Sequence, residues 1–354
     1  MRVVVTGGTG NVGSRVVERL SRDDAVTSIV GIARRRPGWQ PPKTTWLERD
    51  LATDDLTDAV ADADAVVHLA WLFQPTRNPE ITWRANAVGS ARLLRAMADA
   101  GVPVLVHASS IGAYSPRSSD ARSDERVDES WPTHGGAGTA SYSREKAYVE
   151  RLLDTFELRH PDCRVVRMRP AFIFQEAAAS QQRRLFAGPL LPGALVRRGM
   201  VPVLPDPGGL TLQAVHTDDV AEAYRLALLE PVTGAFNLAA EPVLDMPRIA
   251  ECLGARVVRV PPGAVRVGLA AAWAAHLVPA SPGLFDLARQ APLMDTTRAT
   301  GELGWTPSYS SVDALSALLA GLRSGSGGPT PPLDAQSSGP ARWREFASGI
   351  GRKP

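Results

Sequence analysis

The sequence predicts an α/β fold, built as a doubly wound parallel sheet with a smaller C-terminal substrate-binding part. Short β-branched runs alternate with helical patterns over the first half of the chain, and this rhythm is typical of βαβ units. The runs are almost continuously apolar, as expected of strands that helices cover on both faces. A glycine-rich turn directly after the first run indicates the same fold.

The predicted elements follow the chain in a regular order. Strands are expected at residues 1–7, 27–35, 63–71, 102–110 and 164–174, with another that ends near Asp50 and a short one at 234–239. Helices are expected at 12–22, 55–63, 81–101, 140–153 and 215–229. The helices connect successive strands, which is the crossover that parallel strands need.

The same pattern predicts how the chain is divided. Residues 1–170 are expected to form a dinucleotide-binding core, to which 211–240 returns. Residues 171–210 and 241–323 lack the earlier rhythm and are assigned to the substrate-binding part. The last segment, 324–354, is rich in Gly, Ser and Pro and is predicted to be a disordered tail.

Composition excludes several classes of function. The 354 residues carry a net charge of only +2 without a basic run, which argues against nucleic acid as a partner. Cys163 and Cys252 are far apart, so neither a disulfide framework nor a thiolate metal site is expected, and no metal ligand set is recognisable. No secretory signal is visible, and the apolar stretch 267–280 is too short to cross a bilayer. We therefore expect a cytoplasmic protein that acts on a small molecule without a membrane partner.

The glycine-rich turn TGGTGNVG, residues 6–13, follows the first strand and opens the first helix. Early glycines permit a tight turn and a close approach of the backbone to a pyrophosphate, while the last glycine lets helix and strand pack closely. Amide groups at the helix N-terminus then face the phosphates. This context predicts a Rossmann-like dinucleotide site that includes Gly7, Thr9, Gly10, Asn11, Val12 and Gly13.

The end of the second strand indicates which dinucleotide is bound. An Asp or Glu is expected there for the ribose of NAD, but the sequence is IARRRP. Arg34 and Arg35 can pair with a 2′-phosphate, which favours NADP(H) over NAD(H); the alternative is that they only solvate a loop. Asp50 is expected either to accept a hydrogen bond from the adenine or to cap the next helix.

Tyr142 and Lys146 lie four residues apart at the start of a predicted helix and so share one of its faces. Such a pair also occurs in ordinary amphipathic helices. Ser109 and Ser110 follow the strand at 102–110, and ligands of parallel sheets bind at the carboxyl ends of the strands. The combination of glycine turn, serine and Tyr/Lys pair favours the catalytic interpretation.

Over residues 1–322 these motifs together resemble the extended short-chain dehydrogenase/reductase family, also called the NAD-dependent epimerase/dehydratase family. The matching segments are TGGTGNVG, Asp50-Leu51, VVHLAW, Asn86, Ser110 four residues before Tyr114, YSREK, RPAFIF, AVHTDDVAEA and DTTRATGELGWTP. The resemblance implies Tyr142 as acid/base, Ser110 as the group that holds the substrate oxygen, Lys146 on the nicotinamide ribose, and a homodimer. It extends the cofactor site to Leu51, Leu69, Ala70, Trp71, Asn86, Ser109, Tyr142, Lys146, Pro170 and Phe172.

A lysine ammonium one helical turn away and the positive nicotinamide ring are both expected to favour the phenolate of Tyr142, whose unperturbed pKa is about 10. Tyr142 then passes a proton to or from a substrate oxygen while hydride moves between the substrate carbon and nicotinamide.

Departures from the family pattern bear on the substrate. Ile111 and Gly112 replace the Asp-Glu pair of 4,6-dehydratases, and Leu212 and Gln213 stand where many nucleotide-sugar enzymes have Arg-Asp. The first change argues against a dehydratase of that kind. The second argues against a UDP- or GDP-sugar, because a guanidinium that would neutralise the diphosphate is lost, although Arg183, Arg184, Arg197 or Arg198 could substitute. The residues expected at the substrate are Trp71, Phe73, Ser110, Ile111 and Phe172.

The leading hypothesis is an NAD(P)-dependent oxidoreductase that transfers hydride between nicotinamide and a carbonyl or alcohol of a small organic substrate. The alternative is a sugar or nucleotide-sugar epimerase that retains its NAD between turnovers. An alternative of another class is a non-catalytic NADP-binding regulatory protein, for which Ser110, Tyr142 and Lys146 together would have no chemical use.

Overall fold

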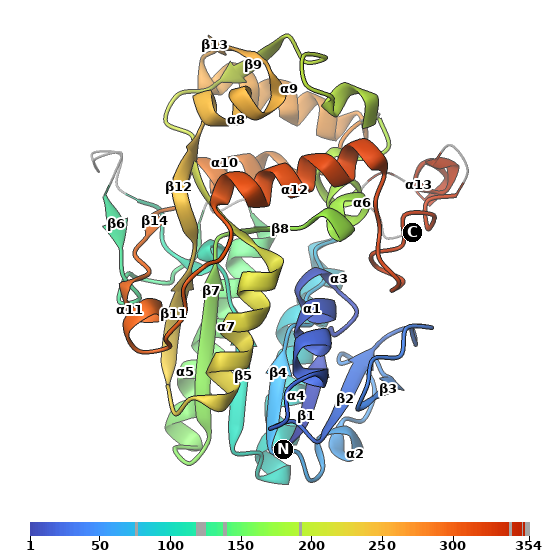
Figure 1. Ribbon diagram of the computed structural model, residues 1–354, viewed down its shortest axis with the longest axis vertical. Coiled ribbons are helices and arrows are strands. Elements are labelled where there is room, and N and C mark those ends of the chain that lie inside the picture. The colour runs from blue at the N-terminus through green and yellow to red at the C-terminus, as the bar shows by residue number, and fades with distance from the viewer. Residues whose placement is uncertain are drawn as a thin grey trace.

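A seven-stranded parallel sheet forms the centre of the lower half of the molecule, with strand order β11-β7-β5-β4-β1-β2-β3 (Figure 1). The computed structural model describes residues 1–74, 77–117, 125–136, 140–190, 193–339, 342–348 and 350. The strands of this sheet are β1 (Arg2–Thr6), β2 (Ser28–Ala33), β3 (Thr44–Glu48), β4 (Ala65–His68), β5 (Val104–Ala108), β7 (Arg164–Pro170) and β11 (Gly234–Leu238). The predicted fold class is confirmed.

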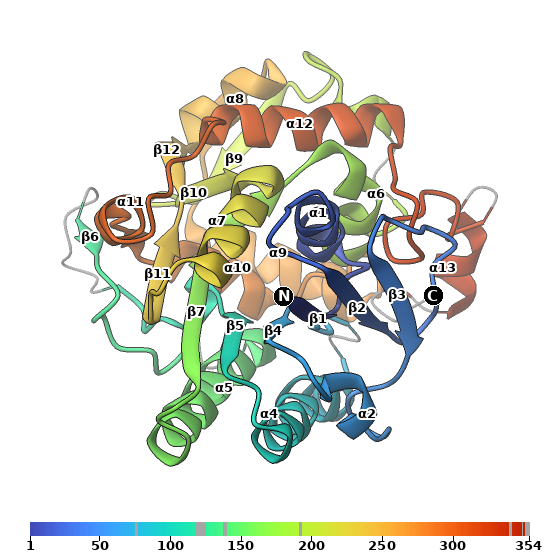
Figure 2. The same ribbon diagram turned by 60° about the horizontal axis from the view of Figure 1, so that its bottom comes forward.

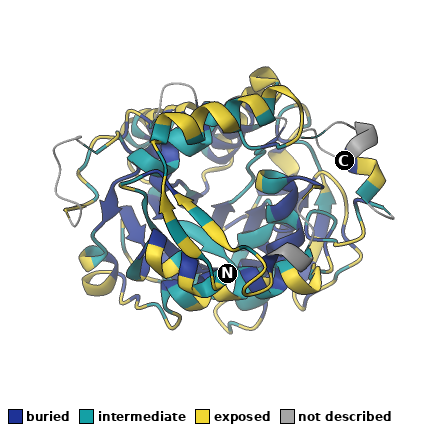
Figure 3. Cartoon of the chain, turned by 90° about the horizontal axis from the view of Figure 1, so that it is seen from above, coloured by how far each residue is buried: buried dark blue, intermediate teal, exposed yellow. Residues whose placement is uncertain are grey.

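Helices cover both faces of this sheet. In Figure 2, α1 (Asn11–Ser21) and α7 (Thr217–Leu229) lie on one face, and α2 (Thr57–Val60), α4 (Gly89–Ala100) and α5 (Ser141–Arg159) lie on the other. Successive side chains of β1 point to opposite faces of the sheet. Val3 and Val5 belong to one buried cluster, and Val4 belongs to the other. Figure 3 shows the buried sheet between the more exposed helices.

The strand order reverses between β1 and β4, and this reversal positions the site. Strands β2 and β3 extend the sheet to one side of β1, and β5, β7 and β11 extend it beyond β4. The amide of Leu69 donates to the carbonyl of Thr6 at 3.1 Å, so the loop after β4 lies against the glycine turn after β1. Ligands of doubly wound sheets bind at such a switch point, outside the carboxyl ends of the strands.

A small sheet of β6 (Arg126–Val127) and β14 (Leu293–Met294) lies beside β11 (Figure 1). The C-terminal part lies mostly above the carboxyl edge of the central sheet. Its small sheets contain β8 (Phe172–Phe174), β10 (Thr211–His216) and β12 (Ala240–Asp245), and β9 (Val203–Asp206) and β13 (Arg256–Arg259). Its helices are α6 (Ala179–Gln182), α8 (Met246–Leu253), α9 (Pro262–Ala274), α10 (Pro282–Gln290), α11 (Thr297–Gly301), α12 (Ser311–Ser324) and α13 (Trp343–Ser348). Helix α12 runs across the molecule between the upper small sheet and the central one (Figure 1).

The apolar stretch 267–280 includes the end of α9, a helix without fully buried residues. Among the described residues, no helix combines the length and the hydropathy that crossing a bilayer requires.

The segment after Ser324 differs from the predicted disordered tail. In its described part, Thr330 and Leu333 are each only 1% exposed, and the Thr330 hydroxyl donates to the Thr9 carbonyl at 2.7 Å. Glu345 of α13 forms a buried ion pair with Arg183 at 2.5 Å. A segment with few apolar residues cannot form a core of its own. Here its polar side chains form a hydrogen bond and an ion pair with residues from the rest of the chain. Residues 340–341, 349 and 351–354 of the predicted tail lie outside the described residues.

Candidate active site

The helix that carries Tyr142 and Lys146 is anchored to the sheet by one buried carboxylate. Glu150 lies one turn after Lys146 on α5 and is completely buried. Its carboxylate accepts hydrogen bonds from Arg169 at 3.0 and 3.1 Å, from Arg167 at 2.9 Å and from the Ser109 hydroxyl at 2.5 Å. Since Arg167 and Arg169 belong to β7 and Ser109 follows β5, this contact fixes α5 over the carboxyl ends of two central strands.

Opposite charge decides the ionisation of this carboxylate. Burial alone would raise the pKa of Glu150, but Arg169, Arg167 and the hydrogen bond from Ser109 lower it to about 2. The carboxylate therefore remains charged at every physiological pH and holds its position through charge-assisted bonds.

Tyr142 is seated against the loop after β5. Its ring lies so close to Gly112 that a Cβ at that position would be 2.7 Å from a ring carbon. Burial raises the pKa of Tyr142 to about 12, although a hydrogen bond with the Ser110 hydroxyl opposes the rise. Without a bound dinucleotide, desolvation of the phenolate therefore keeps the Tyr142 hydroxyl protonated at neutral pH.

Lys146 is 3% exposed and donates to the Ala108 carbonyl at 2.6 Å. Its ammonium lies 3.4 Å from the centroid of the Trp71 ring, which is a cation–π distance. Burial lowers the pKa of Lys146 to about 7, while Glu150 and Glu145 act in the opposite direction. The two residues of the pair are therefore a neutral phenol and an amine that titrates near neutrality.

An aromatic wall stands between Tyr142 and the adjoining cavity. The Phe73 ring lies 4.7 Å from the Tyr142 ring and 5.3 Å from that of Phe186, and the Trp71 ring lies 6.0 Å from Tyr142. Trp71 and Phe73, which we call the aromatic wall, come from the loop after β4. Both residues also line the cavity.

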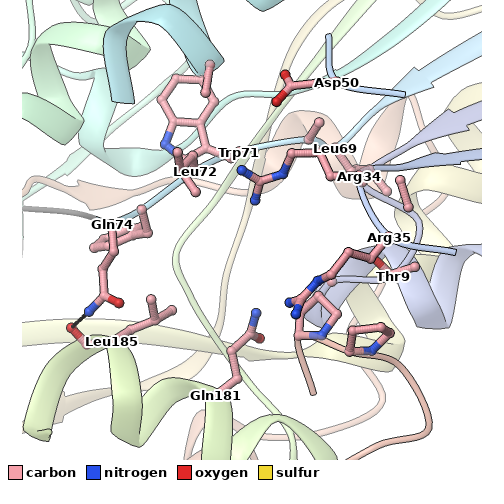
Figure 4. Close-up of a pocket in the computed structure, with 18 of the residues that line it drawn as sticks. Thr9, Arg34, Arg35, Asp50, Leu69, Trp71, Leu72, Gln74, Gln181 and Leu185 are labelled. Carbon is pink, nitrogen blue, oxygen red and sulfur yellow. Dashed lines mark hydrogen bonds between the residues drawn. The ribbon is translucent and has the colours of Figure 1, made fainter. Parts of the chain in front are cut away.

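The cavity has a volume of about 810 Å³ and opens along the carboxyl ends of β1, β2 and β4 (Figure 4). Arg34 and Arg35 extend into it from the end of β2, and Gln181 approaches from the opposite wall. Pro331, Pro332 and other residues of the segment after Ser324 close part of the rim.

Many of the predicted cofactor residues meet in this cavity. Those that line it are Gly7, Thr9, Gly10, Arg34, Arg35, Asp50, Leu51, Leu69, Ala70, Trp71 and Asn86, together with the predicted substrate residue Phe73. The remaining predicted residues lie outside its lining, namely Asn11, Val12, Gly13, Ser109, Ser110, Ile111, Tyr142, Lys146, Pro170 and Phe172. Two residues of the lining, Trp71 and Phe73, contact the Tyr142 ring.

Asn11 and Asp50, two predicted cofactor residues, form hydrogen bonds within the protein. The Asn11 side chain accepts hydrogen bonds from Gln175 at 2.8 Å and from Thr217 at 3.2 Å. Asp50 accepts the Ala52 amide at 2.9 Å and so closes the turn that follows β3, while it also lines the cavity.

The glycine turn has the shape that a dinucleotide requires. Gly7 has a φ of +67°, and a Cβ there would lie 2.6 Å from the Ala70 amide nitrogen. A Cβ at Gly13 would lie 2.1 Å from the Gly7 carbonyl oxygen, so only glycine permits this helix to approach the turn. Helix α1 begins after Gly10 without a side-chain cap and without an acidic residue in its first turn. Its first amides can thus bind a pyrophosphate, and the chain fits a dinucleotide.

Several residues of the site were missed from the sequence. Glu150, Arg167 and Arg169 are separated by 17 and 19 residues, and only the fold brings them together. Arg184, by contrast, was named from the sequence as a residue that could substitute for the absent Arg; it lines the cavity and donates to the carbonyls of Pro332 and Asp334 at 2.6 and 3.1 Å. The one local signal was a charged residue, Glu150, four positions after Lys146 on the same helix face.

The fold and the glycine turn define a dinucleotide-binding protein of the doubly wound α/β class. The family model described as "NAD dependent epimerase/dehydratase family" matches residues 3–239. The chain belongs to this family, as its sequence motifs indicated.

Individual relatives extend the comparison. An uncharacterized protein of Mycobacterium tuberculosis is 29% identical over 328 residues, which cover 91% of this chain but only 30% of that relative's length. A UDP-glucose 4-epimerase of Erwinia amylovora is 28% identical over 273 residues, 68% of this chain and 78% of the relative. The structure of a Thermus thermophilus UDP-glucose 4-epimerase in complex with NAD aligns with a TM-score of 0.66 at 22% identity, and covers 91% of this chain and 99% of its own.

We predict that Glu150→Gln destabilises the protein by about 3–5 kcal/mol at pH 7, because the buried Arg169 guanidinium loses the carboxylate with which it is paired, whereas Arg167 keeps Asp154 and Glu157. Chemical denaturation measures this difference in the free energy of unfolding. Since the folded-state pKa is about 2, below the ordinary 4.5, the contribution of Glu150 is present above pH 4.5 and is lost as the pH falls towards 2. The gap between wild type and variant should therefore narrow over that range.

Glu18→Gln is the control for this measurement. Glu18 pairs with Arg22 at 2.7 Å on the surface, where an ion pair contributes about 0–1 kcal/mol. Equal effects of the two substitutions would contradict the anchoring role of Glu150.

Proposed function

We propose that the chain is an NAD(P)-dependent oxidoreductase that transfers hydride between nicotinamide and a carbonyl or alcohol of a small organic substrate. The observation that carries the proposal is the packing of Tyr142, Ser110 and Lys146 at the carboxyl end of β5, next to a cavity built on the glycine turn. Family membership supports the dinucleotide, and the nicotinamide supplies or accepts the hydride when it is bound.

Tyr142 acts as the proton donor or acceptor on the substrate oxygen. With a pKa of about 12 in the unliganded protein, its hydroxyl is protonated at neutral pH and is ready to donate a proton as a carbonyl is reduced. Ser110 holds the same oxygen by a hydrogen bond. Gly112 leaves room for the Tyr142 ring, and this contact fixes the direction of the hydroxyl.

Lys146 tunes this acid. Because its pKa of about 7 lies near physiological pH, small changes in its surroundings convert it between ammonium and amine. The ammonium lowers the free energy of a phenolate nearby, so it assists Tyr142 when a proton leaves. Lys146 also carries the donors that a ribose hydroxyl requires.

The cavity supports NADP(H) in preference to NAD(H). Arg34 and Arg35 extend into it, and β2 ends without a carboxylate that would bind a free 2′-hydroxyl. The Thermus thermophilus relative is in complex with NAD, so the two arginines are the feature on which this preference rests.

The substrate is expected to be apolar or aromatic near the reacting carbon, since Trp71 and Phe73 cover Tyr142. Gln213 supports a ligand without a diphosphate, because its amide is 1% exposed and is bonded in both directions to the backbone of Met294, at 2.7 and 3.1 Å. Arg183 is likewise occupied by Glu345.

A second candidate function is a sugar epimerase that retains its nucleotide. The segment after Ser324 favours it, because Thr330 closes onto the glycine turn and Pro331 and Pro332 line the cavity rim. A redox-neutral enzyme regenerates its dinucleotide in each turnover and needs no exit for it. The Erwinia amylovora epimerase and the Thermus thermophilus structure support this second reading.

We predict that Tyr142→Phe reduces turnover with NADPH and a carbonyl substrate by about 10²–10⁴-fold, because the proton donor is lost. A panel of ketones and aldehydes, with NADPH absorbance as the readout, supplies the substrate. Titration calorimetry should show unchanged NADPH affinity. Wild-type turnover in the variant would contradict the role of Tyr142.

For the nucleotide, we predict that Arg34→Ala weakens NADPH binding by about 10-fold or more and NADH binding far less, since one charge-assisted contact to a 2′-phosphate contributes about 1.5–3 kcal/mol. Arg36→Ala is the matched control, because Arg36 lies two positions away and is not among the cavity-lining residues. An equal loss of affinity for NADPH and NADH would contradict the assignment of Arg34 to the 2′-phosphate.

The two candidate functions differ in nucleotide exchange. If the nucleotide is retained, NAD(P) should co-purify with the full chain, and deletion of residues 326–354 should speed its release, measured by stopped-flow fluorescence. Ser337→Ala, on the rim but with a hydroxyl bonded only within the segment at 2.9 Å, is the control. If the full chain releases its nucleotide rapidly and the deletion does not change that rate, the epimerase is ruled out and the reductase, which exchanges its nucleotide, remains.

A further inference from the structure

A second buried carboxylate, Glu145, lies between Tyr142 and Lys146 in the YSREK segment and has no assigned role. It is 3% exposed. Its Oε1 accepts a hydrogen bond from the Thr82 hydroxyl at 2.6 Å, and its Oε2 accepts one from the Asn86 amide at 2.6 Å. Thr82 belongs to α3 (Pro79–Trp83) and Asn86 to a π-helical turn (Arg84–Val88), so Glu145 joins α5 to the segment before α4.

Asn86 transmits this contact to the aromatic wall. Its Oδ1 accepts the Leu72 amide at 2.7 Å, and its Nδ2 donates to the Leu72 carbonyl at 2.8 Å. The Asn86 side chain therefore grips both backbone groups of the one residue between Trp71 and Phe73. The far end of the loop is held by Gln74, which donates to the Arg184 carbonyl at 3.0 Å.

The chemistry of a carboxylate sets the direction of that amide. An ionised carboxylate only accepts hydrogen bonds, so it requires Asn86 to turn its NH₂ group towards Glu145. The oxygen of Asn86 must then face the Leu72 amide, as it does. If the amide turned over, its oxygen would face the carboxylate and its NH₂ group would face the Leu72 donor.

The cost of burying Glu145 indicates that stability alone does not account for it. Its hydrogen-bond partners are the neutral groups of Thr82 and Asn86. Burial raises its pKa, although these bonds and the charges of Arg144 and Lys146 act in the opposite direction. A buried carboxylate with a perturbed pKa is more typical of a functional site than of a packing position, and Asn86, to which Glu145 is bonded, lines the cavity.

We infer that Glu145 is a positioning residue: through Asn86 it sets the Leu72 backbone, and thereby holds Trp71 and Phe73 against Lys146 and Tyr142. Glu145 is not among the described residues that line the cavity, whereas Asn86 is. It determines how the wall between the cavity and the acid/base residue is presented to nicotinamide and substrate. The inference rests on the proposed function only where NADPH is used as the probe.

The first test follows amide hydrogen exchange of residues 69–74, which requires no ligand. Glu145→Ala should raise exchange at the Leu72 amide by about 10-fold or more, because Asn86 loses the acceptor that orients it. Glu145→Gln should restore protection, since its amide oxygen can still accept from Asn86 and its NH₂ group can donate to the Thr82 hydroxyl. Arg159→Ala, at the exposed C-terminal end of the same helix, is the matched control.

A double-mutant cycle separates positioning from a general loss of structure. If Glu145 acts through Asn86, the double variant Glu145→Ala/Asn86→Ala should exchange no faster at Leu72 than the more affected single variant. Additive effects, or Glu145→Gln behaving like Glu145→Ala, would overturn the inference. Unchanged exchange in Glu145→Ala would also overturn it.

The second test uses NADPH. Glu145→Ala should weaken NADPH binding and lower kcat together, by about 10–100-fold in kcat/KM, as expected when a wall of the site is displaced. Glu145→Gln should recover most of this loss, and equal losses in the two variants would overturn the inference. If wild type itself does not bind NADPH, the proposed function fails while the exchange experiment still decides the role of Glu145.

Discussion

The contact of Glu150 with Arg167, Arg169 and Ser109 is the interaction on which the site depends. It joins one helix to two strands through a single carboxylate that is removed from water. Tyr142 and Lys146 lie on the two turns that precede this anchor, so their distance from the end of β5 follows from it. A helix held only by apolar contacts could slide by fractions of an ångström, and such displacements matter for proton transfer.

Other ionisable groups of α5 near this anchor are also buried, and burial shifts their pKa values. The pKa of Lys146 falls to about 7 because its ammonium is desolvated, and the pKa of Tyr142 rises to about 12 for the same reason. Glu150 and Glu145 partly offset the first effect. The site thus keeps an uncharged phenol beside an amine near its titration point, and a proton can leave or arrive with little rearrangement of solvent.

The parts of this arrangement that depend on local pattern could be predicted from the sequence. The parallel sheet follows from apolar runs separated by helices, and the glycine turn follows from the spacing of Gly7, Gly10 and Gly13. The parts set by distant partners could not. Arg167 and Arg169 reach Glu150 only through the fold, and Thr330 meets Thr9 across 321 residues of chain. The pKa of Tyr142 depends on burial by Trp71 and Phe73, which no spacing reveals.

The central claim is that Tyr142, seated by Glu150, faces the reactive end of a dinucleotide bound on the glycine turn. A crystal structure of the protein with NADP⁺ tests it most directly. We expect the pyrophosphate at the N-terminus of α1, the 2′-phosphate on Arg34 and Arg35, and the nicotinamide ring beside the Tyr142 hydroxyl. A nicotinamide that lies on the cavity side of the aromatic wall, out of reach of Tyr142 and Ser110, would contradict it.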